Sequence, residues 1–439
     1  MRETFRFGID ILLRRPDQFE AAVFGSLAKI ARRLLAAWFI ILGILPSSAA
    51  AQFASRAIVL AWDGTVPTFV HEMLRQGKLP HLAKLIEGGA FADDVKPGFP
   101  AKTASGFASL ITGAPPRITG ISGNQVPRAP RHQFTILESL AGFSAAPLRA
   151  ETIWSAAARA GKKAIVSHLP TFAAEHAEKS VRFSGYTLIA GRDGIVMNRS
   201  FEPETSEAWD HSPASNAEPI KASFTVGESK FFALLIDDPA DEQAGYDTLV
   251  ISSSRDGHQI LAKLKPAPAG IGGELFWSAP VAVKAAGGED ARVYFRLFDL
   301  KPDGSDFFLY HTRPARDLPT TVQAEAGPSP AARAFVGNGA SLLYQQGALG
   351  RTIPNGGNGL AEERYLETVN FVQHRLMETN RWAIDHLPWD LYLAYTPFPD
   401  ECEHLWRGYL DSTLPTYRPE IAERIKPFLE RAYRSADEH

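Results

Sequence analysis

The spacing of hydrophobic and polar positions changes along the chain, and its first part alternates between strand-like and helix-like segments. A short apolar run over residues 56–62, RAIVLAW, ends at Asp63 and predicts a buried strand with a carboxylate at its carboxyl end. Helical spacing follows over residues 66–88 and 104–111, and residues 152–169 predict a helix, a turn and another strand. This alternation favours a parallel sheet that helices cover on both faces.

From about residue 181 to residue 344 the spacing becomes strand-like. Apolar runs over residues 222–226, 231–236, 248–252 and 293–300 are separated by Gly, Asp and Pro. Such runs bounded by turn-forming residues predict a β-rich segment. We interpret it as an insertion in the α/β core.

Helical spacing returns over residues 362–386, and a predicted strand over residues 390–395 again ends in acidic residues. We therefore expect an α/β fold in which a parallel sheet sandwiched by helices is interrupted by a β-rich insertion. The predicted parts are a leader over residues 1–52, a first part of the α/β core over 53–180, the insertion over 181–345 and a second, incomplete part of the core over 346–439.

The predicted leader has the order of a secretory signal. Arg32 and Arg33 precede an apolar stretch over residues 34–45, which is followed by Pro46 and small residues up to Ala51. The apolar stretch is shorter than the ~20 residues that span a bilayer. Because the charged region before it is unusually long, a misplaced start codon and an uncleaved anchor are alternatives. We expect export to the periplasm or the extracellular space, with membrane attachment only if the segment is uncleaved.

Composition narrows the class of partner. The chain of 439 residues is long enough for two or three modules. Its net charge of -3 includes no basic excess, so we expect a small-molecule substrate and no nucleic-acid binding. The single cysteine, Cys402, cannot form an internal disulfide, so cysteine usage gives no evidence about export.

Thr103 is the first candidate for chemistry. It stands after a Pro-rich loop and just before a predicted helix, where unpaired backbone N–H groups favour an anion. A hydroxyl at that position is well placed to attack phosphorus. For an isolated threonine, capping of the helix is the alternative role.

The surrounding motifs resemble the type I phosphodiesterase/nucleotide pyrophosphatase branch of the alkaline-phosphatase superfamily. The matching features are the strand end at Asp63, the Pro-x-Lys-Thr sequence ending at Thr103, and the Gly-x-x-Gly-Asn turn ending at Asn124. The resemblance continues over residues 153–170. It implies that Asp63 is a metal ligand, that Thr103 is the nucleophile and also a metal ligand, and that Asn124 contacts a phosphoryl oxygen.

A second motif, YTPFPDECEHLWRG, covers residues 395–408. Asp400 and His404 are four residues apart directly after a predicted strand, and a carboxylate and an imidazole at that spacing can bind one Zn²⁺. A surface loop with an incidental acid and histidine is the alternative. The family has the same Asp-x-x-x-His sequence, which implies that Asp400 and His404 are metal ligands. Cys402 matches no family ligand, so we expect it to pack inertly.

The resemblance implies a hydrolase of phosphate esters with two Zn²⁺ or other divalent ions and a covalent phospho-threonine intermediate. The family has three further protein ligands, including an Asp-His pair from a Ser-Asp-His-Gly strand end and a late histidine. The sequence after His404 contains no such motif, and residues 421–439 have helical spacing without a Gly or Pro stop. We therefore expect a C-terminally truncated chain.

Other neighbouring acids and histidines are expected to be ordinary polar residues. The first three pairs precede Asp400, in the wrong order for the family, and the fourth lies in the last predicted helix. The pairs are Asp256 with His258, Asp210 with His211, Asp385 with His386, and Asp437 with His439.

Two other functions compete with hydrolysis. A catalytically incomplete secreted binding protein would keep the fold and use the insertion to recognise a ligand. A phosphoglycerate mutase-like isomerase would share the fold but usually has a serine nucleophile and no export signal. The sequence also leaves the substrate open between phosphodiesters, nucleotide pyrophosphates, monoesters and phosphonates, since function depends on the site and not on the fold.

Overall fold

A computed structural model of the chain defines the region after the predicted leader. It describes residues 55–93, 95–135, 137–169, 180–183, 192–197, 202–203, 209–270, 273–315 and 340–439. Residues Arg56–His439 form one unit, and the predicted leader lies outside the described residues. Within these described ranges, no helix combines the length and apolar character needed to cross a bilayer.

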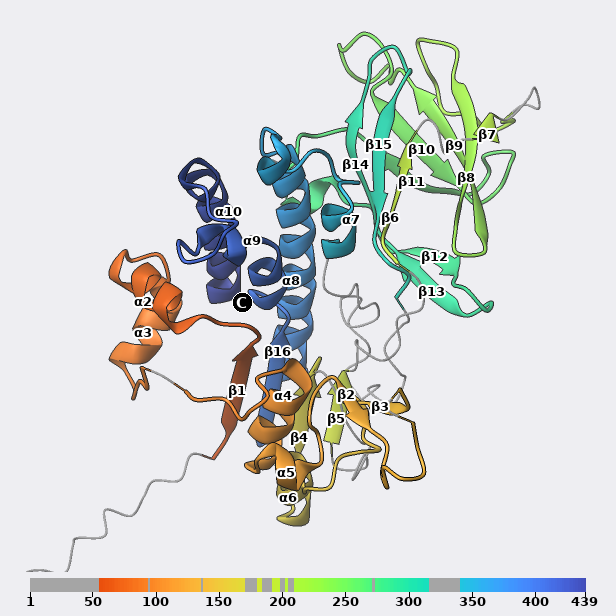
Figure 1. The fold of residues 1–439 in the computed structure, drawn as a ribbon. Helices are drawn as coiled ribbons and strands as arrows, with labels where there is room; N and C mark the ends of the chain where they lie inside the picture. Colours follow the sequence, from red (N-terminus) through yellow and green to blue (C-terminus); the bar gives the residue numbers. More distant parts are fainter. Residues whose placement is uncertain are drawn as a thin grey trace, which may run out of the picture. The chain divides into compact units, whose positions relative to one another are not determined.

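A parallel sheet forms the centre of the α/β part (Figure 1). Its strand order is β1 (Ala57–Trp62), β16 (Leu391–Thr396), β4 (Ala164–Ser167) and β5 (Ser180–Phe183). Each neighbouring pair is parallel. β16 thus inserts between two strands from the other end of the chain, and β5 spans the predicted start of the insertion. The α/β fold class with an inserted β-rich segment is confirmed.

Both faces of the sheet are covered, as the apolar character of its central strands requires. Leu391, Leu393 and Tyr395 of β16 face one core with Phe107 and Trp154. The alternate positions of β16, Tyr392 and Ala394, face a second core that includes Ala383. This period of two is that of a pleated strand.

The helices connect and cover this sheet. Their bounds are α2 (Pro67–Arg75), α3 (Pro80–Glu87), α4 (Thr103–Thr112), α5 (Pro116–Thr119), α6 (Ile153–Arg159), α7 (Ser341–Gln345), α8 (Leu360–His386), α9 (Asp400–Leu410) and α10 (Pro419–Glu438). The single helix predicted over residues 66–88 is wrong, because two helices occupy it. Gly77 has a φ of +66° after α2, and Pro80 begins α3.

The β-rich segment forms antiparallel sheets. Its strands are β6 (Gly194–Met197), β7 (Glu202–Pro203), β8 (Ile220–Val226), β9 (Ser229–Ile236), β10 (Thr248–Ser252), β11 (Ile260–Leu264), β12 (Val281–Lys284), β13 (Asp290–Val293), β14 (Phe295–Leu300) and β15 (Phe307–His311). Sheets β11-β10-β9-β8-β7 and β14-β15-β6 share a core that includes Phe231, Leu249, Phe295 and Leu309. β12 and β13 form a separate antiparallel pair. Outside this segment, β2 (Gln125–Pro127) pairs with β3 (Ser139–Ala141) after α5.

The apolar run over residues 293–300 contains the end of β13 and the whole of β14. Tyr294 separates β13 from β14, and its backbone pairs with Thr312. Its ring packs on Phe371 of α8, with the ring centroids 5.0 Å apart. The neighbouring side chains of Val293 and Phe295 face the sandwich core, so the alternation of the two faces continues through Tyr294.

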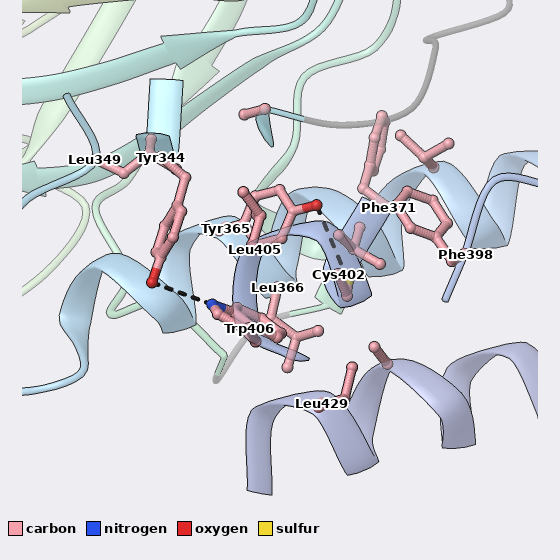
Figure 2. Close-up of a cluster of buried hydrophobic side chains, with 14 of the residues drawn as sticks. Tyr344, Leu349, Tyr365, Leu366, Phe371, Phe398, Cys402, Leu405, Trp406 and Leu429 are labelled. Atoms are coloured by element: carbon pink, nitrogen blue, oxygen red, sulfur yellow. Dashed lines mark hydrogen bonds between the residues drawn. The ribbon is translucent and has the colours of Figure 1, made fainter. Parts of the chain in front are cut away.

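A large apolar cluster joins α7, α8, α9 and α10 (Figure 2). Trp406 Nε1 donates to Tyr344 Oη at 3.1 Å, and Tyr344 Oη donates to Glu362. Cys402 is fully buried beside Tyr365, and burial raises the pKa of its thiol. The thiol therefore belongs to this core.

Candidate active site

Two carboxylates meet at the carboxyl edge of the parallel sheet. Asp63 directly follows β1, and its backbone N–H donates to the Thr396 carbonyl at the end of β16 (3.1 Å). The Asp400 N–H, at the start of α9, donates to the Asp63 carbonyl at 3.0 Å. Parallel pairing of β1 with β16 therefore brings together two residues that are far apart in sequence.

Gly64 makes this approach possible. Its φ is +63°, a conformation that residues with a side chain rarely adopt. A Cβ at this position would collide with Asp400, at both its backbone Cα and its carboxylate. The Asp-Gly sequence at the strand end thus serves close packing as well as the turn.

The environment of the carboxylates favours a bound proton or cation. Burial raises the pKa of Asp63 to about 6, and the neighbouring charge of Asp400 contributes in the same direction. Tyr395 opposes this shift by donating its hydroxyl to Asp63 Oδ2 at 2.8 Å. Burial also raises the pKa of Asp400, while His404 lowers it. Two adjacent, partly buried carboxylates are the kind of donor set that a divalent ion stabilises.

His404 extends the pair by one side chain. Its Nε2 lies 3.2 Å from Asp400 Oδ2, one turn along α9, and its side chain is largely exposed. Within the described part of the chain, however, no three His, Cys, Asp or Glu residues are arranged to hold a metal ion. The structure thus brings Asp63, Asp400 and His404 into a contiguous set but does not arrange them as a three-ligand metal cluster.

Thr103 and Asn124 meet at the start of α4. The helix begins at Thr103, and its N-cap residue, Lys102, makes no side-chain capping bond. Asn124 Oδ1 accepts from the Ala104 N–H at 3.1 Å. The side chain of Asn124, which lies outside α4, thus caps the first turn of this helix. The capping role that the sequence leaves open for Thr103 is filled by Asn124. This bond uses the side-chain oxygen of Asn124 and not its amide Nδ2.

Tyr395 connects the two groups of residues, and sequence reasoning missed it. Its ring packs edge to face on Phe107, one turn after Thr103, with centroids 5.0 Å apart. Its hydroxyl bonds Asp63. The available signal was its place next to the end of the strand that precedes Asp400.

Sequence reasoning also missed His168. This residue follows β4 with a φ of +57°, and burial lowers the pKa of its imidazole to about 3.

Residues of the other acid and histidine pairs make hydrogen bonds that stabilise local structure. Asp437 accepts from the backbone N–H groups of His81 and Leu82 and so caps α3. Asp256 accepts from the His258 N–H within a turn. His386 Nδ1 contacts the Trp382 carbonyl. These contacts are those of ordinary polar residues.

Comparison with known proteins gives one match. Residues 57–210 match the sequence profile of the type I phosphodiesterase/nucleotide pyrophosphatase family, which confirms the resemblance. The matched segment contains Asp63, Thr103 and Asn124, whereas Asp400 and His404 lie beyond it. No curated protein and no solved structure matches the chain. The match indicates phosphoester hydrolysis as the general activity.

Proposed function

We propose that this chain is a metal-dependent hydrolase of phosphodiesters or nucleotide pyrophosphates, and the match of residues 57–210 to the type I phosphodiesterase/nucleotide pyrophosphatase family supports this. The reaction passes through a phosphoryl group on Thr103. The observation that carries the proposal is the convergence of Asp63 and Asp400 at one sheet edge, with Tyr395 linking them to the helix that begins at Thr103.

The residues of the chain have distinct roles in this reaction. The first turn of α4 directs backbone N–H groups toward the phosphoryl group, and Asn124 Nδ2 donates to one of its oxygens. Thr103 Oγ1 attacks phosphorus, so an Oγ1–P bond forms while the ester P–O bond breaks and the departing oxygen takes up a proton. Water then attacks phosphorus, breaks the Oγ1–P bond and restores the hydroxyl.

A divalent ion, Zn²⁺ by the family resemblance, fits the donor set in its chemistry. Asp63, Thr103, Asp400 and His404 are the residues that would supply its ligands by the resemblance, and among the described residues no three His, Cys, Asp or Glu side chains are already grouped as one metal cluster. When bound, such an ion stabilises the alkoxide form of a weakly acidic hydroxyl. The raised pKa of Asp63 supports this role, because a cation between the carboxylates would replace the proton that they otherwise favour.

A binding protein without catalysis is the second candidate. It is favoured by one observation, that the described residues contain no three-ligand metal cluster. In that case the chain would bind phosphoesters at the α4 N-terminus without turnover.

Turnover by Thr103 variants separates these candidates. With added Zn²⁺, the full chain should hydrolyse bis-p-nitrophenyl phosphate. Thr103→Ser should retain much of that activity, and Thr103→Ala should lower turnover by at least about a hundredfold, as loss of a nucleophile does. The Thr103→Ala chain should remain folded by circular dichroism, because Asn124 and not Thr103 caps α4. Equal turnover by Thr103→Ala and the unchanged chain would reject the assigned nucleophile, and no turnover by the unchanged chain would favour the binding protein.

A further inference from the structure

Tyr433 of α10 forms a bridge between two segments that are far apart in sequence. The residue is fully buried. Its hydroxyl accepts from the Val66 N–H at 3.1 Å and donates to Glu403 Oε1 at 2.6 Å. Burial raises the pKa of Tyr433 well above its usual value, so the hydroxyl keeps the hydrogen that it gives to Glu403. The bridge therefore joins the loop before α2 to α9 through a third helix.

Each end of this bridge lies next to one half of the candidate active site. Val66 lies in the short loop that connects Asp63 to α2. Glu403 directly precedes His404 and shares the first turn of α9 with Asp400. The same two segments also meet where the Asp400 N–H donates to the Asp63 carbonyl at 3.0 Å. The buried tyrosine thus links the two segments a second time, by way of α10.

The carboxylate of Glu403 depends on this tyrosine for a hydrogen bond. Its residue is only 8% exposed, and burial raises the pKa of its side chain. Its second oxygen, Oε2, has no hydrogen-bond partner among the described residues. A buried carboxylate that loses its donor is costly. Loss of the Tyr433 hydroxyl would therefore displace Glu403 and, with it, the first turn of α9.

The ring of Tyr433 is held in place independently of its hydroxyl. It packs on Phe69 of α2 with the ring centroids 5.0 Å apart. Both rings belong to the large apolar cluster that also contains Phe398 and Leu429. Removal of the hydroxyl alone should therefore leave this packing in place and affect only the two hydrogen bonds.

We propose that Tyr433 is a positioning residue of the candidate active site, whose hydroxyl fixes Asp63 and Asp400 relative to one another by holding Val66 and Glu403. The residue acts through these two partners and not on the substrate. Its expected effect on turnover rests on the proposed function. Its effect on geometry can be measured without metal or substrate.

Tyr433→Phe removes the hydroxyl and keeps the ring, and Tyr344→Phe is the matched control. Tyr344 is a second buried tyrosine whose hydroxyl donates to a glutamate, Glu362, and accepts an N–H, from Trp406 (Figure 2). Because Trp406 also belongs to α9, the control shows what a similar loss of hydrogen bonds does to this helix outside its first turn. Circular dichroism and urea unfolding should show that both variants are folded, with similar losses of stability.

Hydrogen exchange, followed by NMR on the full chain without metal or substrate, tests the geometry. Asp400 begins α9, so its N–H has no partner within the helix and is protected by the Asp63 carbonyl. We expect Tyr433→Phe to speed exchange of the Val66 and Asp400 N–H groups by at least about tenfold, and Tyr344→Phe to change neither by more than about twofold.

Zinc affinity and turnover test the consequence for the site. The affinity for Zn²⁺, measured by competition with a chromophoric chelator, should fall by at least about tenfold in Tyr433→Phe, as loss of groups that orient metal ligands produces. Turnover of bis-p-nitrophenyl phosphate at saturating Zn²⁺ should fall as well, because the carboxylates are displaced. Tyr344→Phe should keep both quantities within about twofold of the unchanged chain.

Unchanged exchange at Asp400 in a folded Tyr433→Phe chain would overturn the proposal, even if exchange at Val66 became faster. Equal effects of the two variants on exchange or on zinc affinity would also overturn it, because the tyrosine would then act only on general stability. If the unchanged chain shows no turnover, the proposed hydrolysis fails, and the exchange at Asp400 still decides the role of Tyr433.

Discussion

Gly64 occupies the position where the backbone after β1 passes closest to Asp400. Two separate features favour glycine at this position: the backbone has a positive φ, and there is no space for a Cβ. Gly77, which has a nearly identical φ of +66°, has open space around its missing Cβ. Comparison of the two glycines separates conformational strain from collision at the site.

Gly77→Ala should therefore cost about 1 kcal/mol of unfolding free energy, the penalty of a left-handed residue with a side chain. Gly64→Ala should cost more than Gly77→Ala and should also abolish most of the phosphodiesterase activity, because Asp400 must move. Urea unfolding and turnover of bis-p-nitrophenyl phosphate measure the two effects. Equal stability losses with full activity in Gly64→Ala would show that the contact with Asp400 is dispensable.

Tyr395 supplies the hydrogen bond that holds Asp63 Oδ2. Tyr395→Phe keeps the ring contact with Phe107 and removes only the hydroxyl. We expect lower turnover with a stability loss of about 1 kcal/mol, the usual net value of one hydrogen bond.

Tyr392→Phe is the control in the same strand. Its hydroxyl donates to Asn380 Oδ1 at 2.8 Å on the other face of the sheet. A similar stability loss with unchanged turnover is expected for this variant. If both variants lost activity equally, the effect would come from β16 as a whole and not from Asp63.

At the scale of elements, sequence patterns identified the strands that carry Asp63 and Asp400, because short apolar runs ending in acids are distinctive. They could not place β16 between β1 and β4, since pairing between segments so far apart in sequence is a tertiary property. Sequence patterns also merged α2 with α3. There one local departure, at Gly77, interrupts a helical period that otherwise continues.

In the candidate site, too, sequence patterns identify local motifs but not contacts between distant segments. Thr103, Asn124, Asp400 and His404 were found through motif order, which depends on chemistry and spacing. The bond of Tyr395 to Asp63 and the cap on α3 from Asp437 are contacts between distant segments. The place of Tyr395 near the strand end was a signal for that residue, whereas no local pattern predicts the cap.

The Asp437 cap gives a prediction at this scale. Its carboxylate accepts from His81 N–H at 3.0 Å and from Leu82 N–H at 2.8 Å, and α3 has no side-chain cap of its own. Asp437→Ala should lower the unfolding free energy by about 1 kcal/mol, and Asp437→Asn should restore part of it. Glu423→Ala, at an exposed position of α10, should have little effect in the same urea titration. Equal losses in both alanine variants would contradict the capping role.

For the molecule as a whole, the β-rich segment is joined to α8 by a buried ion pair and by stacked rings. Arg296 Nε donates to Glu367 Oε1 at 2.5 Å, with both side chains buried, and Trp277 stacks on Phe371. Loss of one partner of such a pair leaves an uncompensated buried charge. The helix that covers the parallel sheet therefore also anchors the β-rich segment.

The central claim is that Thr103 becomes phosphorylated during hydrolysis of a phosphoester. The direct measurement is mass analysis of peptides from the full chain after reaction with bis-p-nitrophenyl phosphate and Zn²⁺ and quenching in acid. The account predicts a phosphoryl-type adduct on Thr103, present in Thr103→Ser on the new serine and absent in Thr103→Ala. Turnover at the rate of the unchanged chain by Thr103→Ala, with no adduct on Thr103 in the unchanged chain, would contradict it.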